Sequence, residues 1–270
     1  MKTMFTFKQK YTVDDLVEIM RILRSENGCP WDREQTHESI RKNFIEETYE
    51  AIEAINKQDS HLLCEELGDV LMQVVFHAQM EAEKQVFDFS DVADGVCKKL
   101  IERHPHVFGE VEVDSSDDVL RNWEQIKSAS KQRKTVADKM NSGPRELPAL
   151  MRADKIQRQA AKVGFDWDEF ADAAKKISEE QAELADAVAA NDRENTVEEL
   201  GDLLFAVVNV ARKLDIDPEE ALTKATDKFQ TRFTAVEALA NARNIVMAES
   251  DLKTLDRLWD EVKATAKQES

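Results

Sequence analysis

The pentapeptide EELGD occurs twice in this chain, at Glu65–Asp69 and again at Glu198–Asp202, 133 positions later. The acidic block EETYE at Glu46–Glu50 returns as EEQAE at Glu179–Glu183 with the same offset of 133. Because the register is kept across both blocks, the segment between them has the same length in each half. Self-similarity at a fixed period is the signature of a duplicated structural unit. We therefore expect the chain to fold as two copies of one unit.

Three further landmarks repeat in the same order around the acidic blocks. They are GCPWD at Gly28–Asp32 with GFDWD at Gly164–Asp168, the basic pairs Lys99 with Arg103 and Lys228 with Arg232, and WEQIK at Trp123–Lys127 with WDEVK at Trp259–Lys263. Between the copies, residues 128–148 are polar, contain NSGP and lack an apolar stripe, which favours a linker. The predicted domains are residues 1–127 and 149–270, joined by a linker at 128–148.

Helix-breaking residues are scarce, since 270 positions hold only 7 Gly and 5 Pro. Ala, Glu, Lys, Leu and Asp dominate instead, which favours long helices over strands. One apolar stripe keeps the i, i+3, i+4, i+7, i+8 spacing of a helix face and consists of Leu67, Val70, Leu71, Val74 and Val75. We expect an all-α fold of two tandem helical bundles, in which this stripe is buried against other helices.

Capping residues indicate where several helices begin and end. Thr12 can cap a first helix while Asp15 closes the capping box, and Asp59 or Ser60 can cap a third. A fourth helix is expected from about Ser90 to Arg103, because the following HPH turn contains a proline that cannot continue a helix interior.

The charge balance limits the possible partners. Lys and Arg number 37 against 55 Asp and Glu, a formal net charge of −18. This charge repels nucleic acid and anionic membranes, so we expect neither as a partner. No apolar run is long enough for a signal peptide or a membrane span. Cys29, Cys64 and Cys97 are odd in number and lack CxxC spacing, which favours buried reduced thiols in a cytoplasmic protein.

The spacing of the acidic residues points to a site. On a helix, Glu47 and Glu50 are i, i+3 neighbours and Glu46 and Glu50 are i, i+4 neighbours, so three carboxylates share one flank. Glu66 and Asp69 share a flank of the next helix, turned away from the apolar stripe. If a short loop makes the two helices antiparallel neighbours, these carboxylates converge. A solvated acidic face is the alternative, but exposed acids are interchangeable and do not need the same spacing twice.

Converging carboxylates need a positive partner. Two like charges about 6 Å apart repel by roughly 3 kcal/mol at an effective dielectric near 20. A divalent cation relieves this repulsion, and ligation by oxygen alone favours Mg²⁺, Mn²⁺ or Ca²⁺. Mg²⁺ characteristically combines a few carboxylates with the oxygens of a phosphate substrate. The repeated acidic blocks therefore predict a magnesium site for a phosphate-bearing ligand.

Several other residues allow two interpretations. Lys228 and Arg232 could hold phosphate or form an ordinary exposed basic pair. Trp259 could stack on a nucleobase or fill core, which tryptophan does more often. Lys176 could face phosphate or solvent. The five histidines have no counterparts between the two halves, which argues against a shared catalytic role for them.

Together the EExxE, ExxD, KxxxR and WxxxK patterns resemble the MazG family of nucleoside triphosphate pyrophosphohydrolases, in its two-domain bacterial form. The resemblance runs from about Leu16 to Lys263 and includes GCPWDREQTHESI, EELGDVLMQVVFHA, RHPHVFGE and KVGFDWD. It implies an all-α, Mg²⁺-dependent enzyme, with Mn²⁺ as a possible substitute, that forms an intertwined homodimer. The implied reaction is hydrolysis of NTPs and dNTPs to the monophosphate and pyrophosphate, with broad base specificity.

Carried over residue by residue, the resemblance assigns three groups of site residues. The metal ligands are Glu180, Glu183, Glu199 and Asp202 in the second copy, with Glu47, Glu50, Glu66 and Asp69 as counterparts in the first. The candidates for orienting the attacking water are Glu179 and Glu46. The substrate-binding residues are Lys176, Lys228, Arg232, Trp259 and Lys263, with Trp259 packed on the base.

Both copies keep the acidic pattern, so the metal residues do not show whether both are active. After the basic pair, the first copy breaks at Pro105 while the second continues as KFQTRFTAVEAL, which leads us to favour the second copy as the main catalytic domain. The first copy would be a weaker enzyme or a dimerisation and regulatory module.

Two other classes of protein are alternatives to the pyrophosphohydrolase interpretation. A di-iron carboxylate bundle needs Glu-x-x-His on two helices, and this chain has that spacing only at Glu34–His37. A non-enzymatic scaffold could use the acidic faces to bind a basic protein.

Overall fold

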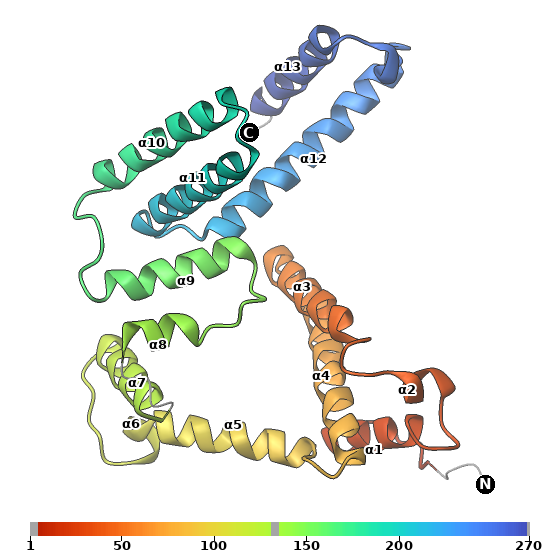
Figure 1. The fold of residues 1–270 in the computed structure, drawn as a ribbon. Helices are drawn as coiled ribbons and strands as arrows, with labels where there is room; N and C mark the ends of the chain where they lie inside the picture. The colour runs from red at the N-terminus through yellow and green to blue at the C-terminus, as the bar shows by residue number, and fades with distance from the viewer. Residues whose placement is uncertain (1–4, 131–134, 269–270) are drawn as a thin grey trace. The chain divides into compact units, whose positions relative to one another are not determined.

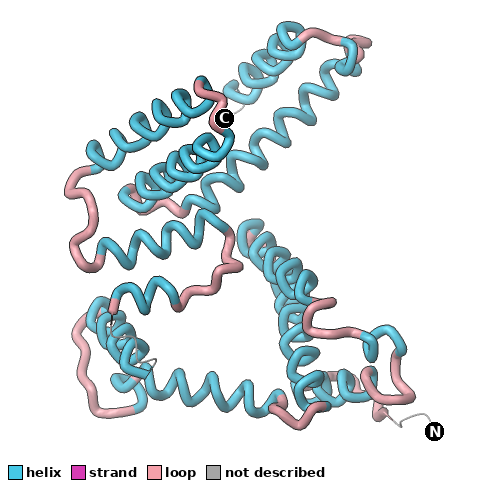
Figure 2. The backbone as a smooth tube through the Cα atoms, viewed as in Figure 1, coloured by secondary structure: helices cyan, strands magenta, loops and turns pink. Residues whose placement is uncertain are grey.

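The computed structural model describes residues 5–130 and 135–268 (Figure 1). Every regular element in these two ranges is helical, and Figure 2 shows no strand among them. The expected all-α fold is therefore confirmed. The chain divides into two compact units, unit 1 at residues 1–128 and unit 2 at residues 129–270.

Unit 1 holds the first copy of the repeated pattern. Its helices are α1 (Val13–Leu23), α2 (Pro30–Glu34), α3 (Arg41–Lys57), α4 (Ser60–Glu83), α5 (Phe89–Arg103), α6 (Pro105–Phe108) and α7 (Ser116–Ser130). Its hydrophobic core joins α1 to α4 through Met20, Val75, Phe76 and Met80, and Ile40 closes it from the start of α3.

Unit 2 holds the second copy. Its elements are α8 (Val136–Asn141), α9 (Ala149–Ala161), α10 (Phe170–Ala189), α11 (Arg193–Lys213), α12 (Pro218–Ala242), the 3₁₀ turn η1 (Met247–Glu249) and α13 (Leu252–Gln268). A core cluster of Val236, Ala240 and Leu258 joins α12 to α13, which lies back along the second half of α12 (Figure 1). Helices α9 and α11 pack together, so α9 closes one side of the unit.

The predicted helix ends are confirmed where capping residues set them. Thr12 and Asp15 form a reciprocal capping box, in which the Thr12 backbone N–H donates to the Asp15 carboxylate at 2.9 Å. Asp59 caps α4 by accepting from the two backbone N–H groups of His61 and Leu62, each at 3.0 Å. Helix α5 ends at Arg103, and Pro105 starts the separate short helix α6. The residues at which these helices begin are therefore set by side chains that accept hydrogen bonds from the unpaired N–H groups of the first turn.

The two acidic helices of each unit lie side by side, as the spacing predicts. Helix α3 packs along α4, and α10 packs along α11 (Figure 1). The apolar stripe is only partly buried, contrary to our expectation: Val75 and its counterpart Val208 are buried, but Leu67 and Leu204 are 53% and 51% exposed. One antiparallel neighbour covers only part of a helix circumference, which leaves part of each stripe uncovered.

The predicted linker at 128–148 includes helix α8, which packs on α9. One other expectation differs from the structure. The cysteines are free, as expected, but they are not buried, because Cys64 and Cys97 are exposed and Cys29 is half-buried. Cys64 and Cys97 lie on helix faces that no neighbouring helix covers.

The GxxWD turn that precedes each acidic helix is held by an ion pair, and the polarity is opposite in the two units. In unit 1, Arg24 donates to the Glu83 carboxylate at 2.8 and 2.9 Å and to the Asp32 carbonyl at 2.5 Å. In unit 2, Arg212 donates to Asp166 at 2.5 and 3.0 Å, and Lys213 lies 2.9 Å from the same carboxylate. Each pair ties the turn to the last part of α4 or α11.

The Asp166 pair should contribute pH-dependent stability. The Arg212 guanidinium, followed by Lys213, lowers the pKa of Asp166 to about 2 from its ordinary value of 3.8. A depressed pKa stabilises the folded state above the unfolded value, and this stability is lost as the pH falls from about 4 towards 2.

We therefore expect Asp166→Asn to lower the free energy of unfolding by about 1–2 kcal/mol at pH 7, with the deficit disappearing near pH 2. Urea unfolding of both proteins across this pH range measures the difference. Asp168→Asn is the matched control, since Asp168 is exposed in the same turn and makes no ion pair with any residue that the structure describes. An equal loss in both variants at pH 7 contradicts the assignment.

Candidate functional site

Carboxylates from α10 and α11 meet in unit 2. Glu180, Glu199 and Asp202 each offer an oxygen atom, and these three atoms lie within 4.8 Å of one another. Glu199 and Asp202 are i, i+3 neighbours and so share a flank of α11, while Glu180 reaches them from α10 and is only 5% exposed. The predicted convergence of acidic flanks is thus present in the second copy.

The other two acidic residues of the EExxE block adjoin this group. Oxygen atoms of Glu179, Glu180 and Glu183 also lie within 4.8 Å of one another. Glu180 belongs to both groups, so it connects them. All five carboxylates that the sequence analysis selects in the second copy therefore belong to one cluster, called here the unit 2 carboxylate cluster.

Unit 1 repeats this arrangement with one difference. Oxygen atoms of Glu47, Glu66 and Asp69 lie within 4.8 Å of one another. Glu50 is close enough to raise the pKa values of Glu47 and Glu66. Glu46 joins no such group among the described residues and is exposed.

Four carboxylates of the two clusters hold protons more tightly than usual. Burial is the largest cause of the raised pKa values of Glu47, Glu66, Glu183 and Glu199, and repulsion by neighbouring carboxylates comes next. For Glu199 these neighbours are Glu183, Glu180 and Asp202, in that order. Each cluster is therefore a place where added positive charge lowers the electrostatic energy.

Lys176 provides part of that charge in unit 2. Its ammonium lies 2.8 Å from Glu179 and 2.6 Å from Glu180, and the two carboxylates raise the pKa of Lys176 well above its ordinary value. The lysine also draws Glu179 towards Glu180, which accounts for the difference from Glu46. At the repeat offset of 133, the position of Lys176 is occupied in unit 1 by Asn43, which carries no charge. The two clusters are therefore electrostatically unequal.

A cavity of about 520 Å³ opens beside the unit 2 cluster, called here the aromatic cavity. Lys176, Glu180 and Asp202 line it on the cluster side, and Phe165, Trp167 and Phe205 contribute aromatic rings. Such a combination of apolar walls with a few charged groups is typical of small-molecule sites. Trp167, the tryptophan of the repeated GFDWD motif, lies in this wall.

Buried polar groups of the aromatic cavity were missed by the sequence analysis. Gln157 is buried, and its amide donates to the Phe205 carbonyl at 2.8 Å, while its side-chain oxygen has no hydrogen-bond partner among the described residues. Asn209 is buried beside it in the lining and accepts a hydrogen bond from Arg212. Both residues lie outside the repeated motifs. The only signal for Asn209 was a polar side chain on an otherwise apolar stretch of α11, FAVVNVA, while Gln157 lies on the polar helix α9 and gave none.

The remaining predicted substrate-binding residues lie on α12 and α13. Trp259 packs against the α12–α13 core, with its ring centroid 5.2 Å from that of Phe229, and Lys263 lies 3.9 Å from Asp260. In the described part of the chain, Lys228, Arg232, Trp259 and Lys263 make no hydrogen bond or ion pair with the carboxylate cluster, and they do not line the aromatic cavity. The single chain therefore does not bring them to the site.

The counterpart tryptophan in unit 1 is covered by cations of its own unit. The Trp123 ring lies under the Lys127 ammonium at 4.4 Å and the Arg103 guanidinium at 5.2 Å. Arg103 and Lys127 are the counterparts of Arg232 and Lys263. Cation–π contacts of this kind stabilise the ring in place and occupy surface on which a base would stack. Trp123 is thus less suited to base stacking than Trp259.

The histidines lie apart from both clusters. His37 makes hydrogen bonds with Glu81 at 2.6 Å and with His77 at 2.7 Å, and all three belong to unit 1. The Glu34–His37 spacing therefore uses its imidazole in a contact with α4 rather than beside the carboxylates. Among the described residues, neither carboxylate cluster contains a histidine, and the di-iron alternative loses its required ligands.

Paired acidic helices, repeated once, define a class of all-α nucleotide-processing proteins, and comparison with known proteins identifies it. A model of the MazG nucleotide pyrophosphohydrolase domain matches residues 35–108 and 169–236, which include both carboxylate clusters. This chain belongs to the MazG family.

Relatives with similar sequences carry names that agree with this family. The nucleoside triphosphate pyrophosphohydrolase of Escherichia coli K12 is 46% identical, over 93% of this chain and 97% of its own length. A protein of Thermotoga maritima, named nucleoside triphosphate pyrophosphohydrolase/pyrophosphatase MazG, is also 46% identical, over 93% and 95%. A nucleoside triphosphate pyrophosphohydrolase of Mycobacterium tuberculosis is 36% identical over 78% of this chain. Within the described ranges, no helix is both long enough and apolar enough to span a membrane.

Removing one charge from the cluster should stabilise the metal-free protein. Because the folded pKa of Glu199 is raised, the folded protein binds more protons than the unfolded chain between the two pKa values, and its stability falls as the pH rises through that window. Glu199→Gln in EDTA should therefore raise the unfolding midpoint temperature at pH 7.5, and the gain should shrink towards pH 4.5. Glu198→Gln is the matched control, since Glu198 is the exposed neighbour in the same EELGD motif. Thermal unfolding followed by circular dichroism tests this, and equal midpoints for Glu199→Gln and wild type at pH 7.5 argue against repulsion in the cluster.

Proposed function

We propose that this protein hydrolyses nucleoside triphosphates to nucleoside monophosphates and pyrophosphate, using a divalent cation held by the carboxylate clusters. One observation carries the proposal: in each unit, acidic side chains from two paired helices bring their oxygen atoms within 4.8 Å of one another. The names of the relatives, which are nucleoside triphosphate pyrophosphohydrolases, support the same reaction.

The donor set fits Mg²⁺, with Mn²⁺ as a possible substitute. All the candidate ligands are carboxylate oxygens, and the raised pKa values of Glu183 and Glu199 reflect a need for positive charge. In unit 2 the ligands would be Glu180, Glu183, Glu199 and Asp202. When bound, a divalent cation supplies neutralisation of phosphate charge and lowers the pKa of water.

The protein's own side chains would position the substrate and move the proton. Glu179 lies at the exposed edge of the cluster and would accept the proton of the attacking water. Its counterpart Glu46 is exposed and outside the unit 1 group, so it would be less well placed for this role. The bond that breaks joins the α- and β-phosphates, so pyrophosphate leaves with the β- and γ-phosphates. The aromatic cavity would receive the nucleoside, and rings stack on every base, which supports broad base specificity.

Three structural differences favour unit 2 as the main catalytic unit. Only the unit 2 cluster has a lysine at the Lys176 position, where unit 1 has Asn43. The aromatic cavity adjoins the unit 2 cluster. In unit 1, Trp123 is covered by Arg103 and Lys127. Unit 1 would then serve as a weaker enzyme or as a dimerisation and regulatory module.

A homodimer would account for the exposed apolar stripes and for the distant basic residues. Leu200, Leu204 and Val207 on α11 are each at least 45% exposed, which is unusual for an unpaired helix face. A second copy packed there would bury them, and it could bring Lys228, Arg232, Trp259 and Lys263 to a cluster that the single chain does not bring them to. The free thiols and the net charge of −18 suit a cytoplasmic protein that does not bind nucleic acid.

Matched substitutions in the two clusters should separate the two units. We expect Glu180→Gln to lower the rate of dNTP hydrolysis in Mg²⁺ by about 100-fold or more, since even the outer partners of a metal site are worth about 10–100-fold. Glu47→Gln, the same change at the matching position of unit 1, should lower the rate much less. The assay separates dNTP, monophosphate, pyrophosphate and orthophosphate after incubation with and without Mg²⁺.

Each outcome of this assay decides between classes of protein. Monophosphate with pyrophosphate, formed only when Mg²⁺ is present, supports the proposal. Orthophosphate alone counts against cleavage between the α- and β-phosphates. Absence of any product supports the scaffold alternative, in which the acidic faces bind a basic protein. Equal activity of Glu180→Gln and wild type would contradict the assignment of the unit 2 carboxylate cluster as the main catalytic site.

The dimer can be tested through the exposed stripe. Leu204→Glu introduces a charge into the apolar stripe of α11 and should convert a dimer to a monomer in sedimentation velocity. Leu252→Glu is the control, because Leu252 is 81% exposed at the start of α13 and lies outside the stripe. A wild-type protein that sediments as a monomer at all concentrations contradicts the dimer.

A further inference from the structure

Unit 2 contains another cavity, which lies outside both segments that the family model matches. It has a volume of about 250 Å³ and lies between α8, residues 141–147 and α9. Four cationic side chains line it, those of Lys139, Arg145, Arg152 and Lys155. No Asp or Glu occurs among the described residues that line it. We call this space the basic cavity.

The charge of the basic cavity is not compensated by the protein. The chain has 55 acidic and 37 basic residues. Its average composition therefore does not predict a cavity whose charged lining residues are all cations. In the part of the chain that the structure describes, the side chains of Lys139, Arg145, Arg152 and Lys155 make no hydrogen bond and no ion pair. Other lysines of unit 2, such as Lys175 and Lys224, pair with acidic neighbours.

The cations surround an apolar floor and a tight turn. Met140, Leu147 and Ile156 provide apolar lining, which lowers the local dielectric and strengthens attraction for an anion. At Gly143, an added Cβ would lie 3.9 Å from the Lys155 ammonium, so Lys155 reaches over this turn. The lysine on α9 and the 141–147 segment therefore face the same space.

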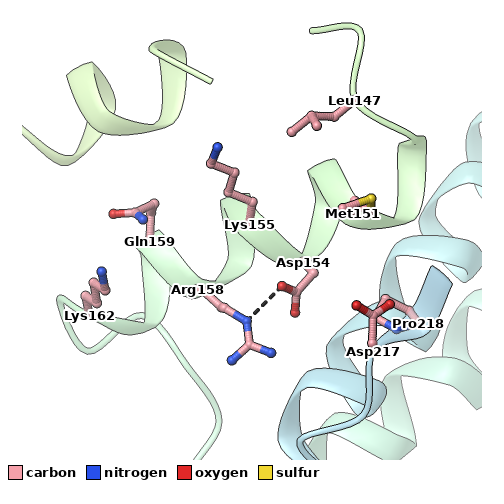
Figure 3. A pocket seen from close by; sticks show the side chains of 9 residues that line it. All are labelled: Leu147, Met151, Asp154, Lys155, Arg158, Gln159, Lys162, Asp217 and Pro218. Atoms are coloured by element: carbon pink, nitrogen blue, oxygen red, sulfur yellow. Dashed lines mark hydrogen bonds and ion pairs between the residues drawn. The ribbon is translucent and has the colours of Figure 1, made fainter. Parts of the chain in front are cut away.

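A neighbouring cavity along α9 is lined by acidic as well as basic side chains. Figure 3 shows this neighbouring space, where Arg158 donates to Asp154 at 2.7 Å and Lys155 points away from that pair. The neighbouring cavity of about 390 Å³ is lined by Asp154 and Asp217 as well as by cations. Its lining sets Asp154 and Asp217 against Lys155, Arg158 and Lys162, so most of its positive charge is compensated, unlike that of the basic cavity.

We propose that the basic cavity binds a small phosphate-rich anion of the size of inorganic pyrophosphate, without a metal ion. Two guanidinium groups, those of Arg145 and Arg152, can each present paired donors to phosphate oxygens, and the two lysines add point charges. The cavity has about half the volume of the aromatic cavity, which suits a diphosphate better than a whole nucleoside triphosphate. Pyrophosphate is also the product under the proposed function, but binding here does not depend on that reaction.

Isothermal titration of the full-length chain with sodium pyrophosphate in EDTA tests the proposal. Without divalent cations the carboxylate clusters repel phosphate, so binding under these conditions reports the basic cavity. We expect one site per chain, an affinity that falls with added NaCl, and an affinity about 10-fold or more weaker in the double variant Arg152→Gln, Lys155→Gln. The control Lys175→Gln, Lys224→Gln removes the same charge from exposed helix positions of unit 2 and should bind like wild type.

A second variant protects the test against misfolding. Arg145→Gln changes a residue in the connection before α9 rather than in a helix, and it should also weaken binding. Circular dichroism confirms the helix content of each variant before titration. Glu180→Gln should bind pyrophosphate in EDTA as wild type does, whatever its activity towards dNTPs. The pyrophosphate titration can therefore be interpreted even if the proposed hydrolysis is not observed.

Several outcomes would overturn the proposal. Absence of pyrophosphate binding to the wild-type chain in EDTA excludes the site, and unchanged binding in the Arg152→Gln, Lys155→Gln variant places the anion elsewhere. Tighter binding of ADP than of pyrophosphate shows that a nucleoside diphosphate is the ligand rather than the inorganic anion. Equal affinity for succinate and pyrophosphate shows that the cavity selects charge and not phosphate.

Discussion

Repulsion between carboxylates on neighbouring helices is the constraint around which each unit is arranged. Pairing α10 with α11 buries apolar surface, but it also forces Glu180, Glu199 and Asp202 to within 4.8 Å of one another, where burial and mutual repulsion raise the pKa of Glu199. A fold selected for stability alone would place these acids on the wet faces, as exposed charges cost little there. The arrangement makes physical sense as stored electrostatic energy that a divalent cation and its phosphate ligand release on binding.

The two units each have an ion pair beside the GxxWD turn, but the charges of the two partners are exchanged. Arg24 and Glu83 tie the turn in unit 1, while Asp166 and Arg212 tie it in unit 2 with the polarity reversed. Such exchanges are tolerated because a tie needs only opposite charges at the right distance. Beside the clusters the exchange is not neutral, because a lysine is replaced by Asn43 and the local field changes. Duplication therefore preserved the carboxylates while the surroundings diverged.

The segment between the two matched regions is more than a connection. Helix α8 packs on α9, and together they gather positive charge in a strongly acidic protein. This charge lies in the same unit as the carboxylate cluster, in a cavity that shares Met140 and Ile156 with the aromatic cavity. Unit 2 therefore has two places of opposite charge at which phosphate could be held by different means. One needs a cation to bridge acid and phosphate, and the other supplies its cations as side chains.

The sequence by itself determined the helical class, the duplication, several helix ends and the acidic residues that meet, because these depend on local capping, helix periodicity and repeat register. Thr12 and Asp59 predicted helix starts, and the two EELGD motifs predicted the duplication. Only the tertiary structure decided that Glu46 stays outside the carboxylate group, that Lys176 binds carboxylates, and that Gln157 and Asn209 line a cavity. It also left Leu204 exposed and packed Trp259 against the α12–α13 core. The physical reason is that periodicity gives the face on which a residue lies, whereas contacts depend on how far apart packed helices lie and which of their faces meet.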